Sequence, residues 1–180
     1  MRILLCVTGS VAAKLTSKVV NAFTERGDTV KVAITESARR FVEMGASQDF
    51  MSECYSDQNE LNWKQRGDEI AHIALRESSD VLLVAPLTAN TLATFAVGQA
   101  NNLVTNIFRA WDFSKPCFVA PSMNTKMYEH PFTKEHLDKI GGLGVKVIAP
   151  QVKTMMCNER GNGAMADISD IIDAVYGNKS

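Results

Sequence analysis

Short runs of consecutive apolar residues alternate along the chain with segments whose apolar residues recur at helical spacing. The first run, "RILLCV", is followed by a segment in which Val11, Leu15, Val19 and Phe23 share one helical face up to Gly27. The β-branched run "TVKVAIT" comes next, and "ESARRFVEM" after it has helical character. The sequence therefore predicts a β-α-β opening.

Three further apolar runs, "VLLVAP", "KPCFVAP" and "VKVIAP", all end in Ala-Pro, and helix-compatible segments separate them. Continuous apolar strands that alternate with helices are typical of a parallel sheet covered on both faces. Proline fixes φ and lacks an N–H group, so we expect each strand ladder to end at its proline. The pattern predicts a three-layer α/β fold with a parallel, Rossmann-like (flavodoxin-like) sheet.

Length and composition narrow the function classes. The chain has 180 residues, and no stretch rich in Pro, Gly or Ser divides it, so we expect one domain over residues 1–180. Its formal charge of -1 offers no basic excess to hold nucleic acid or an anionic membrane. Gly9 and Ser10 interrupt the first apolar run before it is long enough to span a bilayer. We expect a cytoplasmic protein with neither a nucleic-acid nor a membrane partner.

The four cysteines form no Cys-x-x-Cys pair and have no regular spacing, so the sequence predicts neither a metal site nor a disulfide framework. Cys6 and Cys117 lie inside apolar runs, where a thiol behaves as a small hydrophobe. Cys157 lies instead among glycines and charges in "CNERGNGAMAD", where nothing obvious buries it. This cysteine needs another explanation.

In parallel sheets, ligands bind in the loops beyond the carboxyl ends of the strands. After the first strand, "TGSVAAK" places Gly9, Ser10 and Val11 at a helix start, where free N–H groups and the helix dipole favour an anion. A simple N-cap by Ser10 is the structural alternative. The loop lacks both G-x-G-x-x-G and a P-loop ending, which favours a mononucleotide. Thr35 and Ser37, after the second strand, could add hydroxyls to the same site.

The loop "PLTANT" and the helix end "FRAWD" add candidate ligand contacts. Thr88 and Asn90 lie at a strand-to-helix junction, and Ala89 is small enough to let a flat ring approach. Asn90 offers both a donor and an acceptor to a heterocycle edge, although capping explains these residue types equally. Arg109 either pairs with Asp112 or reaches a ligand or a neighbouring subunit.

Two further segments carry polar groups that could bind a substrate or act in catalysis. In "PSMNTKMYEHP", Asn124 could hold a carboxylate without neutralising it; the alternative is that this loop is a structural turn. We expect Met123 and Met127 to be packing residues. "DEIAHIALRE" predicts a helix that Asp68 caps, and His72 lies near the edge of its apolar face. A lone histidine there can also be a packed or exposed side chain.

Taken together, these loops resemble those of the phosphopantothenoylcysteine decarboxylases, within the homo-oligomeric flavin-containing Cys decarboxylases. The resemblance spans roughly residues 2 to 175 and rests on several separated motifs in the same order. Residues 86–91 match the family's Pro-x-Ser-Ala-Asn-Thr loop, with Thr88 in place of serine. Residues 121–128 match its Pro-x-Met-Asn-x-x-Met-Trp loop, with Tyr128 in place of tryptophan. Residues 157–165 match the family's motif that closes over the substrate, called its substrate clamp, with Asn158 in place of glycine.

The resemblance implies FMN as the cofactor, bound near a subunit boundary of a homotrimer. The cofactor-binding residues expected from the loops and the resemblance are Gly9, Ser10, Val11, Thr35, Ser37, Pro86, Leu87, Thr88, Ala89, Asn90 and Arg109. The substrate-binding residues expected in the same way are Asn124, Met127, Gly161, Gly163 and Ala164. The expected catalytic residues are His72 and Cys157.

The activity implied is the FMN-dependent decarboxylation of 4'-phosphopantothenoylcysteine to 4'-phosphopantetheine in coenzyme A biosynthesis, through a thioaldehyde and an enethiolate. His72 would act in the oxidative half, and the Cys157 thiol would donate the final proton. Alternatives are a peptidyl-cysteine decarboxylase, a flavin prenyltransferase, electron transfer, or a non-enzymatic regulator that resembles fungal phosphatase inhibitors. The chain has no long acidic tail and retains both His72 and Cys157, which argues against the regulator.

Overall fold

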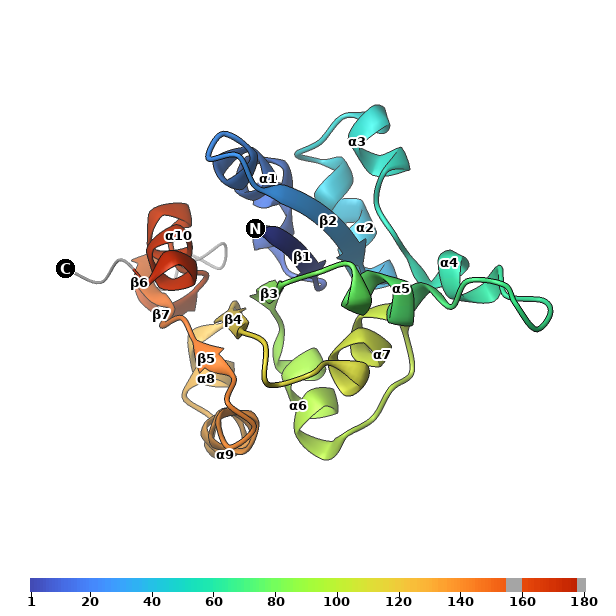
Figure 1. Cartoon of the computed structure of the whole chain (residues 1–180). Helices are drawn as coiled ribbons and strands as arrows, with labels where there is room; N and C mark the ends of the chain where they lie inside the picture. The colour runs from blue at the N-terminus through green and yellow to red at the C-terminus, as the bar shows by residue number, and fades with distance from the viewer. Residues whose placement is uncertain (155–159, 178–180) are drawn as a thin grey trace.

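The computed structural model describes residues 1–154 and 160–177 of the chain. Five parallel strands form the central sheet in the order β2-β1-β3-β4-β5 (Figure 1). Their bounds are β1 Arg2–Val7, β2 Thr29–Ile34, β3 Val81–Leu87, β4 Cys117–Pro121 and β5 Lys146–Val147. The parallel sheet and its covering helices confirm the predicted α/β fold.

Helices occupy most of the connections. A 3₁₀ helix, η1, leads directly into α1, so the first predicted helix is confirmed with a tighter first turn. The bounds are η1 Val11–Leu15, α1 Thr16–Thr24, α2 Glu36–Glu43, α3 Gln48–Ser52, α4 Asp57–Leu61, α5 Ala71–Glu77, α6 Ala89–Val97, α7 Leu103–Ala110, α8 Thr125–Tyr128, α9 Pro131–Gly141 and α10 Ile168–Tyr176.

Two apolar clusters cover the two faces of the sheet. Alternate residues of β1 point to opposite faces, so Ile3 and Leu5 join the cluster under α1, α2 and α10, whereas Leu4 and Cys6 join the one under α5, α6, α7 and α9. β3 and β4 are buried along their whole length. Each fully buried leucine contributes about 2 kcal/mol through removal of apolar surface from water. The continuous apolar runs are therefore explained by burial on both sides.

The prediction that each strand ladder ends at its proline is wrong for Pro86 and confirmed for Pro121. Pro86 lies inside β3, and its carbonyl oxygen accepts the backbone N–H of Thr8 at 3.2 Å. Pro121 is the last residue of β4 and pairs with Leu87. Proline lacks only the donor, so its carbonyl still continues the ladder. The run "VKVIAP" forms only the two-residue β5, and Pro150 precedes the next strand.

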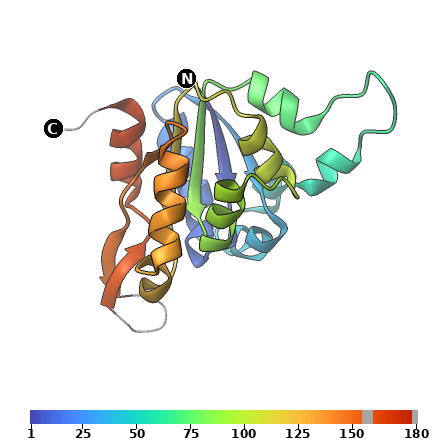
Figure 2. The same cartoon turned by 90° about the horizontal axis from the view of Figure 1, so that it is seen from below.

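An antiparallel hairpin follows the sheet. Its strands are β6, Gln151–Thr154, and β7, Arg160–Ala164. In Figure 2 the hairpin lies beside α9 and α10, away from β2. The sequence analysis did not predict this pair of strands.

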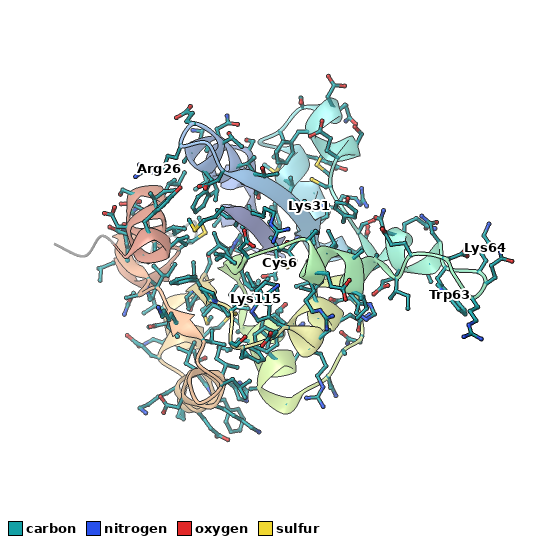
Figure 3. All side chains as sticks on the ribbon, in the orientation of Figure 1. Cys6, Arg26, Lys31, Trp63, Lys64 and Lys115 are labelled. Carbon is teal, nitrogen blue, oxygen red and sulfur yellow. The ribbon has the colours of Figure 1, made fainter. Side chains whose placement is uncertain are left out.

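The segment between α4 and α5 projects from the body of the protein in both views (Figures 1 and 2). We call residues 61–70 the arm. Leu61 is 71% exposed and Trp63 is 49% exposed, and Figure 3 shows Trp63 pointing away from the body. Asp68 does not cap α5 as predicted: its carboxylate accepts the backbone N–H groups of Lys64 and Gln65, and so stabilises a turn of the arm. α5 begins only at Ala71.

Candidate active site

The carboxyl end of the sheet has a topological switch point between β1 and β3. From β1 the chain passes to β2 on one side, and the later strands β3, β4 and β5 follow on the other (Figure 1). The loops after β1 and β3 therefore leave in opposite directions, which opens a crevice where open α/β sheets bind ligands. The predicted loops "TGSVAA" and "PLTANT" follow these two strands.

Thr8 joins the two sides of this switch point. Its hydroxyl donates to the Pro86 carbonyl oxygen at 2.8 Å and accepts the Thr88 backbone N–H at 2.9 Å. Thr8 is buried, so both bonds are shielded from water. Sequence analysis missed Thr8, although it directly precedes the "GS" pair that was singled out.

Two serines connect the exits of β1 and β4. The Ser10 and Ser122 hydroxyl oxygens lie 2.9 Å apart, and the Ser122 backbone N–H donates to the Leu87 carbonyl oxygen at 2.8 Å. Ser10 also accepts the Ala12 N–H at 3.3 Å as the N-cap of η1. The capping interpretation of Ser10 is therefore correct, and its place at the switch point is compatible with ligand binding as well.

Gly9 and the start of α2 approach each other closely. A Cβ atom on Gly9 would lie 2.5 Å from the Ser37 hydroxyl oxygen and 2.7 Å from Ser37 Cβ. Ser37 Oγ in turn lies 3.1 Å from Thr35 Oγ1. The structure thus brings Gly9, Ser10, Thr35 and Ser37 together, beside the half-buried Val11 that begins η1.

The residues around this edge fit FMN. Hydroxyls from four strand exits and the first N–H groups of η1 are donors that suit a phosphate. The absence of a side chain on Gly9 lets Ser37 pack directly against the backbone there. Thr88 caps α6 by accepting the Thr91 N–H at 3.4 Å, while Asn90 is exposed on the first turn with Ala89 half-buried beside it.

Arg109 lies away from the other predicted cofactor residues in this chain. Its guanidinium is the nearest group to Gly98, where a Cβ would lie 3.0 Å from Nη1. Gly98 ends α6, whose opposite end carries Ala89 and Asn90 about 14 Å away. Between the described residues Arg109 and Asp112, no ion pair is found. The role of Arg109 as a cofactor contact stays a prediction.

The predicted substrate loop packs on the hairpin. The Met123 backbone N–H donates to the Gly163 carbonyl oxygen at 2.9 Å. Gly163 has φ +129°, a conformation that side chains rarely adopt. A Cβ on Gly161 would overlap Thr125 Oγ1 and lie 2.8 Å from Thr125 Cγ2. Gly161 is therefore needed for the close approach of β7 and α8, and Gly163 for the backbone conformation beside Met123.

Asn124 is the N-cap of α8 at this contact, and its Oδ1 atom accepts the Lys126 N–H at 2.8 Å. Met127 is 49% exposed, so it does not pack inside the chain as predicted, and the four-residue α8 has no buried residue. Ala164 closes β7 opposite Gln151. The structure brings all five predicted substrate residues to one region.

The two predicted catalytic residues are placed differently. Cys157 lies outside the described residues, between the end of β6 and the start of β7. His72 is on the first turn of α5, with 25% of its side chain exposed. Its Nδ1 atom hydrogen-bonds to Glu60 Oε1, which also accepts Asn106 Nδ2 at 3.2 Å. Sequence analysis missed Glu60 and Asn106.

The two strand cysteines are core residues, as predicted. Burial raises the pKa of the Cys117 thiol to about 12 and that of the Cys6 thiol further still. Both thiols are therefore protonated and shielded at neutral pH. Among the described residues, no cluster of His, Cys, Asp and Glu could hold a metal ion. In the same part of the chain, no helix has the length and apolar character needed to cross a membrane.

The sequence profile of the flavoprotein family matches residues 1–180. The chain belongs to the flavoprotein family. This flavoprotein is 45% identical over 175 residues to a phosphopantothenoylcysteine decarboxylase, HAL3a, of Glycine max, which covers 97% of this chain and 82% of that protein. It is 42% identical over 176 residues to the phosphopantothenoylcysteine decarboxylase of Mus musculus, covering 97% and 85% of the two chains.

Solved structures share the fold of this flavoprotein closely. A cysteine-to-serine mutant of PPC decarboxylase, complexed with pantothenoylaminoethenethiol, superposes with a TM-score of 0.91 at 42% identity, over 98% of this chain and 97% of that one. The FMN-binding protein AtHal3 superposes with a TM-score of 0.85 at 40% identity, over 99% and 98% of the two chains.

Proposed function

We propose that this flavoprotein is an FMN-dependent phosphopantothenoylcysteine decarboxylase, which converts 4'-phosphopantothenoylcysteine to 4'-phosphopantetheine in coenzyme A biosynthesis. The observation that carries the proposal is the superposition, with a TM-score of 0.91, on a PPC decarboxylase that holds pantothenoylaminoethenethiol. The described parts of the site, from the switch point to the hairpin on the Asn124 loop, are compatible with this reaction.

The switch-point residues would hold FMN. Hydroxyls of Ser10, Thr35 and Ser37 and the N–H groups at the start of η1 would bind its phosphate. Pro86, Leu87 and the exposed Asn90 would line its ring, next to the small Ala89. Bound FMN would supply a two-electron oxidation of the substrate CH2–SH group, which places the carboxylate β to a C=S bond.

The Asn124 loop and the hairpin would hold the substrate. Asn124 would bind the carboxylate through its amide while Oδ1 caps α8, and a neutral partner does not oppose the departure of CO2. Gly161, Gly163 and Ala164 keep β7 against this loop, and Met127 offers an exposed apolar contact. This arrangement would exclude water from one side of the carboxylate.

His72 and Cys157 would act in the two halves of the reaction. His72 would accept the thiol proton or orient the substrate before CO2 is lost. The thiol of Cys157 would donate a proton to the carbon that neighbours the reduced position, because an ordinary thiol is mostly protonated at neutral pH. Substitution of His72 and substitution of Cys157 should therefore stop the reaction at different steps.

We also propose a homotrimer in the cytoplasm with sites shared between subunits. α5, which carries His72, and α8, which follows Asn124, lie apart in one chain in both views (Figures 1 and 2). Leu61, Trp63 and Ile70 of the arm are exposed, at 71%, 49% and 43%. An assembly that covers the arm would bury these side chains and bring His72 of one subunit to Asn124 of another.

The decisive experiment supplies the purified protein with FMN and 4'-phosphopantothenoylcysteine and follows CO2 and product mass. We expect a flavin absorption spectrum, CO2 release and 4'-phosphopantetheine. Cys157→Ser should release CO2 but accumulate the oxidised enethiol, whereas His72→Asn should release none. A Cys157→Ser enzyme that makes normal 4'-phosphopantetheine would exclude the donor role.

Rival substrates and roles are separated in the same assay. A peptide with a C-terminal cysteine is the comparison substrate, and preference for it would identify a peptidyl-cysteine decarboxylase. If the purified protein shows no flavin spectrum and no turnover, that result would support the regulatory role.

Subunit sharing is tested by mixing two inactive variants. His72→Asn removes the proposed base, and Asn124→Asp keeps the cap of α8 but repels the substrate carboxylate. Coexpressed as mixed oligomers, the two variants should regain part of the activity, since some sites then combine intact residues. A monomer in sedimentation analysis, with no recovery, would contradict the shared site.

A further inference from the structure

Glu60 lies at the centre of a three-residue hydrogen-bond chain across three helices. Its Oε1 atom accepts from His72 Nδ1 on α5 and from Asn106 Nδ2 on α7. The Glu60 side chain is only 18% exposed, although a carboxylate is normally well hydrated. A mostly buried carboxylate that accepts two bonds has a fixed position.

The short helix that carries Glu60 is itself held in place. α4 has five residues, which is too few to be stable alone. Its Asp57 carboxylate accepts the Leu103 N–H at 2.7 Å, at the start of α7, and Asn59 closes a capping box by accepting the Ser56 N–H at 2.8 Å. The position of Glu60 is therefore determined by α7, which is part of the buried core.

We propose that Glu60 is a positioning residue that selects the tautomer and ring orientation of His72, an inference that rests on the proposed role of His72 in the decarboxylation. An ionised carboxylate can only accept hydrogen bonds, so Nδ1 must carry the proton in their contact. Nε2 is then the nitrogen with the free lone pair and accepts the substrate proton. Asn106 holds the Glu60 carboxylate in the orientation that this requires.

Glu60 also stabilises the imidazolium that forms when His72 accepts a proton. The negative charge lies in direct contact with Nδ1, and its limited exposure reduces screening by water. An interhelical contact with a purely structural role would change stability on mutation but would not set the ring tautomer. The two roles therefore differ in a spectroscopic observable.

The first test determines the tautomer of His72 by ¹⁵N NMR and needs no enzymatic turnover. The chain has three histidines, so ¹⁵N-histidine labelling gives few imidazole signals, and His72→Gln assigns the one of interest. At alkaline pH, where an imidazole is neutral, wild type should show Nδ1 protonated and Nε2 unprotonated. Glu60→Leu should move His72 toward the Nε2–H form, while the His130 and His136 signals stay unchanged.

The second test measures kcat and KM of the FMN-loaded enzyme. Glu60→Leu should lower kcat by about 100-fold, the scale of a positioned acid or base, with KM nearly unchanged. Glu60→Gln retains an acceptor oxygen but loses the charge, so its loss of kcat should be smaller. Glu77→Gln is the matched control, because Glu77 is on α5, the helix that carries His72, but is 65% exposed and paired with Arg76.

The outcomes are separable from those of the proposed function. An unchanged His72 tautomer in Glu60→Leu, or an unchanged kcat, overturns the positioning role. If wild type lacks decarboxylase activity, the proposed function fails while the tautomer measurement still decides whether Glu60 orients His72. Should Glu60→Leu fail to fold, Asn106→Ala releases Glu60 with α4 still held by Asp57, and the same tautomer shift, in weaker form, is expected.

Discussion

The hydroxyl oxygens of Ser10 and Ser122 lie 2.9 Å apart, although 112 positions separate them in the chain. Ser10 follows β1 and Ser122 follows β4, and β3 lies between these strands in the sheet. Ser122 also donates its N–H to Leu87 at the end of β3. Three strand exits thus share one polar edge, which is the most testable feature of the proposed cofactor site.

Thr8→Val should weaken both stability and FMN binding. Valine has nearly the same shape but removes the hydroxyl that bonds to Pro86 O and Thr88 N. The Thr88 N–H would lose its partner and the Pro86 carbonyl would keep only the Thr8 backbone N–H, which should cost about 1–3 kcal/mol in the free energy of unfolding, measured in urea. Thr24→Val is the control, because Thr24 is exposed and its hydroxyl bonds only within α1. Equal effects of the two variants would contradict the role of Thr8.

Gly9→Ala should displace the first turn of α2 and lower FMN affinity. The new Cβ would lie 2.5 Å from Ser37 Oγ, and such overpacking typically costs about 1–3 kcal/mol. Flavin fluorescence titration measures the affinity. Gly141→Ala is the control, since no heavy atom outside its own helix lies within 4 Å of the added Cβ.

A second substitution tests the cause of the Gly9→Ala effect. Ser37→Gly removes the two nearest side-chain atoms of the clash, so the double variant should recover part of the stability lost in Gly9→Ala. If the stability losses of the two single variants simply add in the double variant, the contact between Gly9 and Ser37 does not explain the effect of Gly9→Ala.

Gly161→Ala should raise KM for the substrate while leaving FMN binding nearly unchanged. The added Cβ overlaps the Thr125 side chain, so β7 must move away from the Asn124 loop. The cofactor residues are on other strand exits and are not displaced. Thr125→Ala in the same chain should restore KM toward wild type, as steady-state kinetics would show. A fall in kcat at constant KM would argue against this explanation.

Tyr176→Phe should destabilise the protein in a pH-dependent way. The Tyr176 hydroxyl donates to the buried Asp28 carboxylate, which also accepts from the Met1 amino group at 2.7 Å. Burial acts to raise the pKa of Asp28, but these hydrogen bonds outweigh it and hold the pKa below its ordinary value. Phenylalanine keeps the ring against Phe23, so the variant removes mainly the hydrogen bond.

The sign of this effect follows from the lowered pKa. A carboxyl with a depressed pKa stabilises the fold fully above its unfolded pKa of about 4, and that stabilisation is lost as the pH falls further. We expect Tyr176→Phe to cost about 1–2 kcal/mol at neutral pH, and less below about pH 4. Urea unfolding at several pH values measures it. A double-mutant cycle with Asp28→Asn isolates the pair, and a loss that does not change with pH would contradict the argument.

The alternation of strands and helices, the buried faces and the loops of the site could be predicted from the sequence. Strand runs such as "VLLVAP" are local patterns, and burial on both faces leaves them apolar throughout. The residues after parallel strands meet at one edge by topology, so Gly9, Thr35 and Asn90 could be grouped before any contact was known. The Asn124 loop and the Cys157 segment also stood out in the sequence, and the family resemblance supplied their expected roles.

Other features depended on contacts between distant residues, which have no local signal. The β6–β7 hairpin is polar and rich in glycine, and its position depends on the contact of Gly161 with Thr125. The positions of Arg109 beside Gly98 and of Asp68 in the arm likewise follow from packing and competing hydrogen bonds.

The sequence by itself determined the fold class and the strand exits that form the site, because periodicity and turn chemistry act over a few residues. Only the tertiary structure decided that Thr8 joins β1 to β3 and that Glu60 holds His72. Those pairs form because α4, α5, α7 and the strands pack into one core, which brings polar groups within hydrogen-bond distance whatever their spacing in the chain.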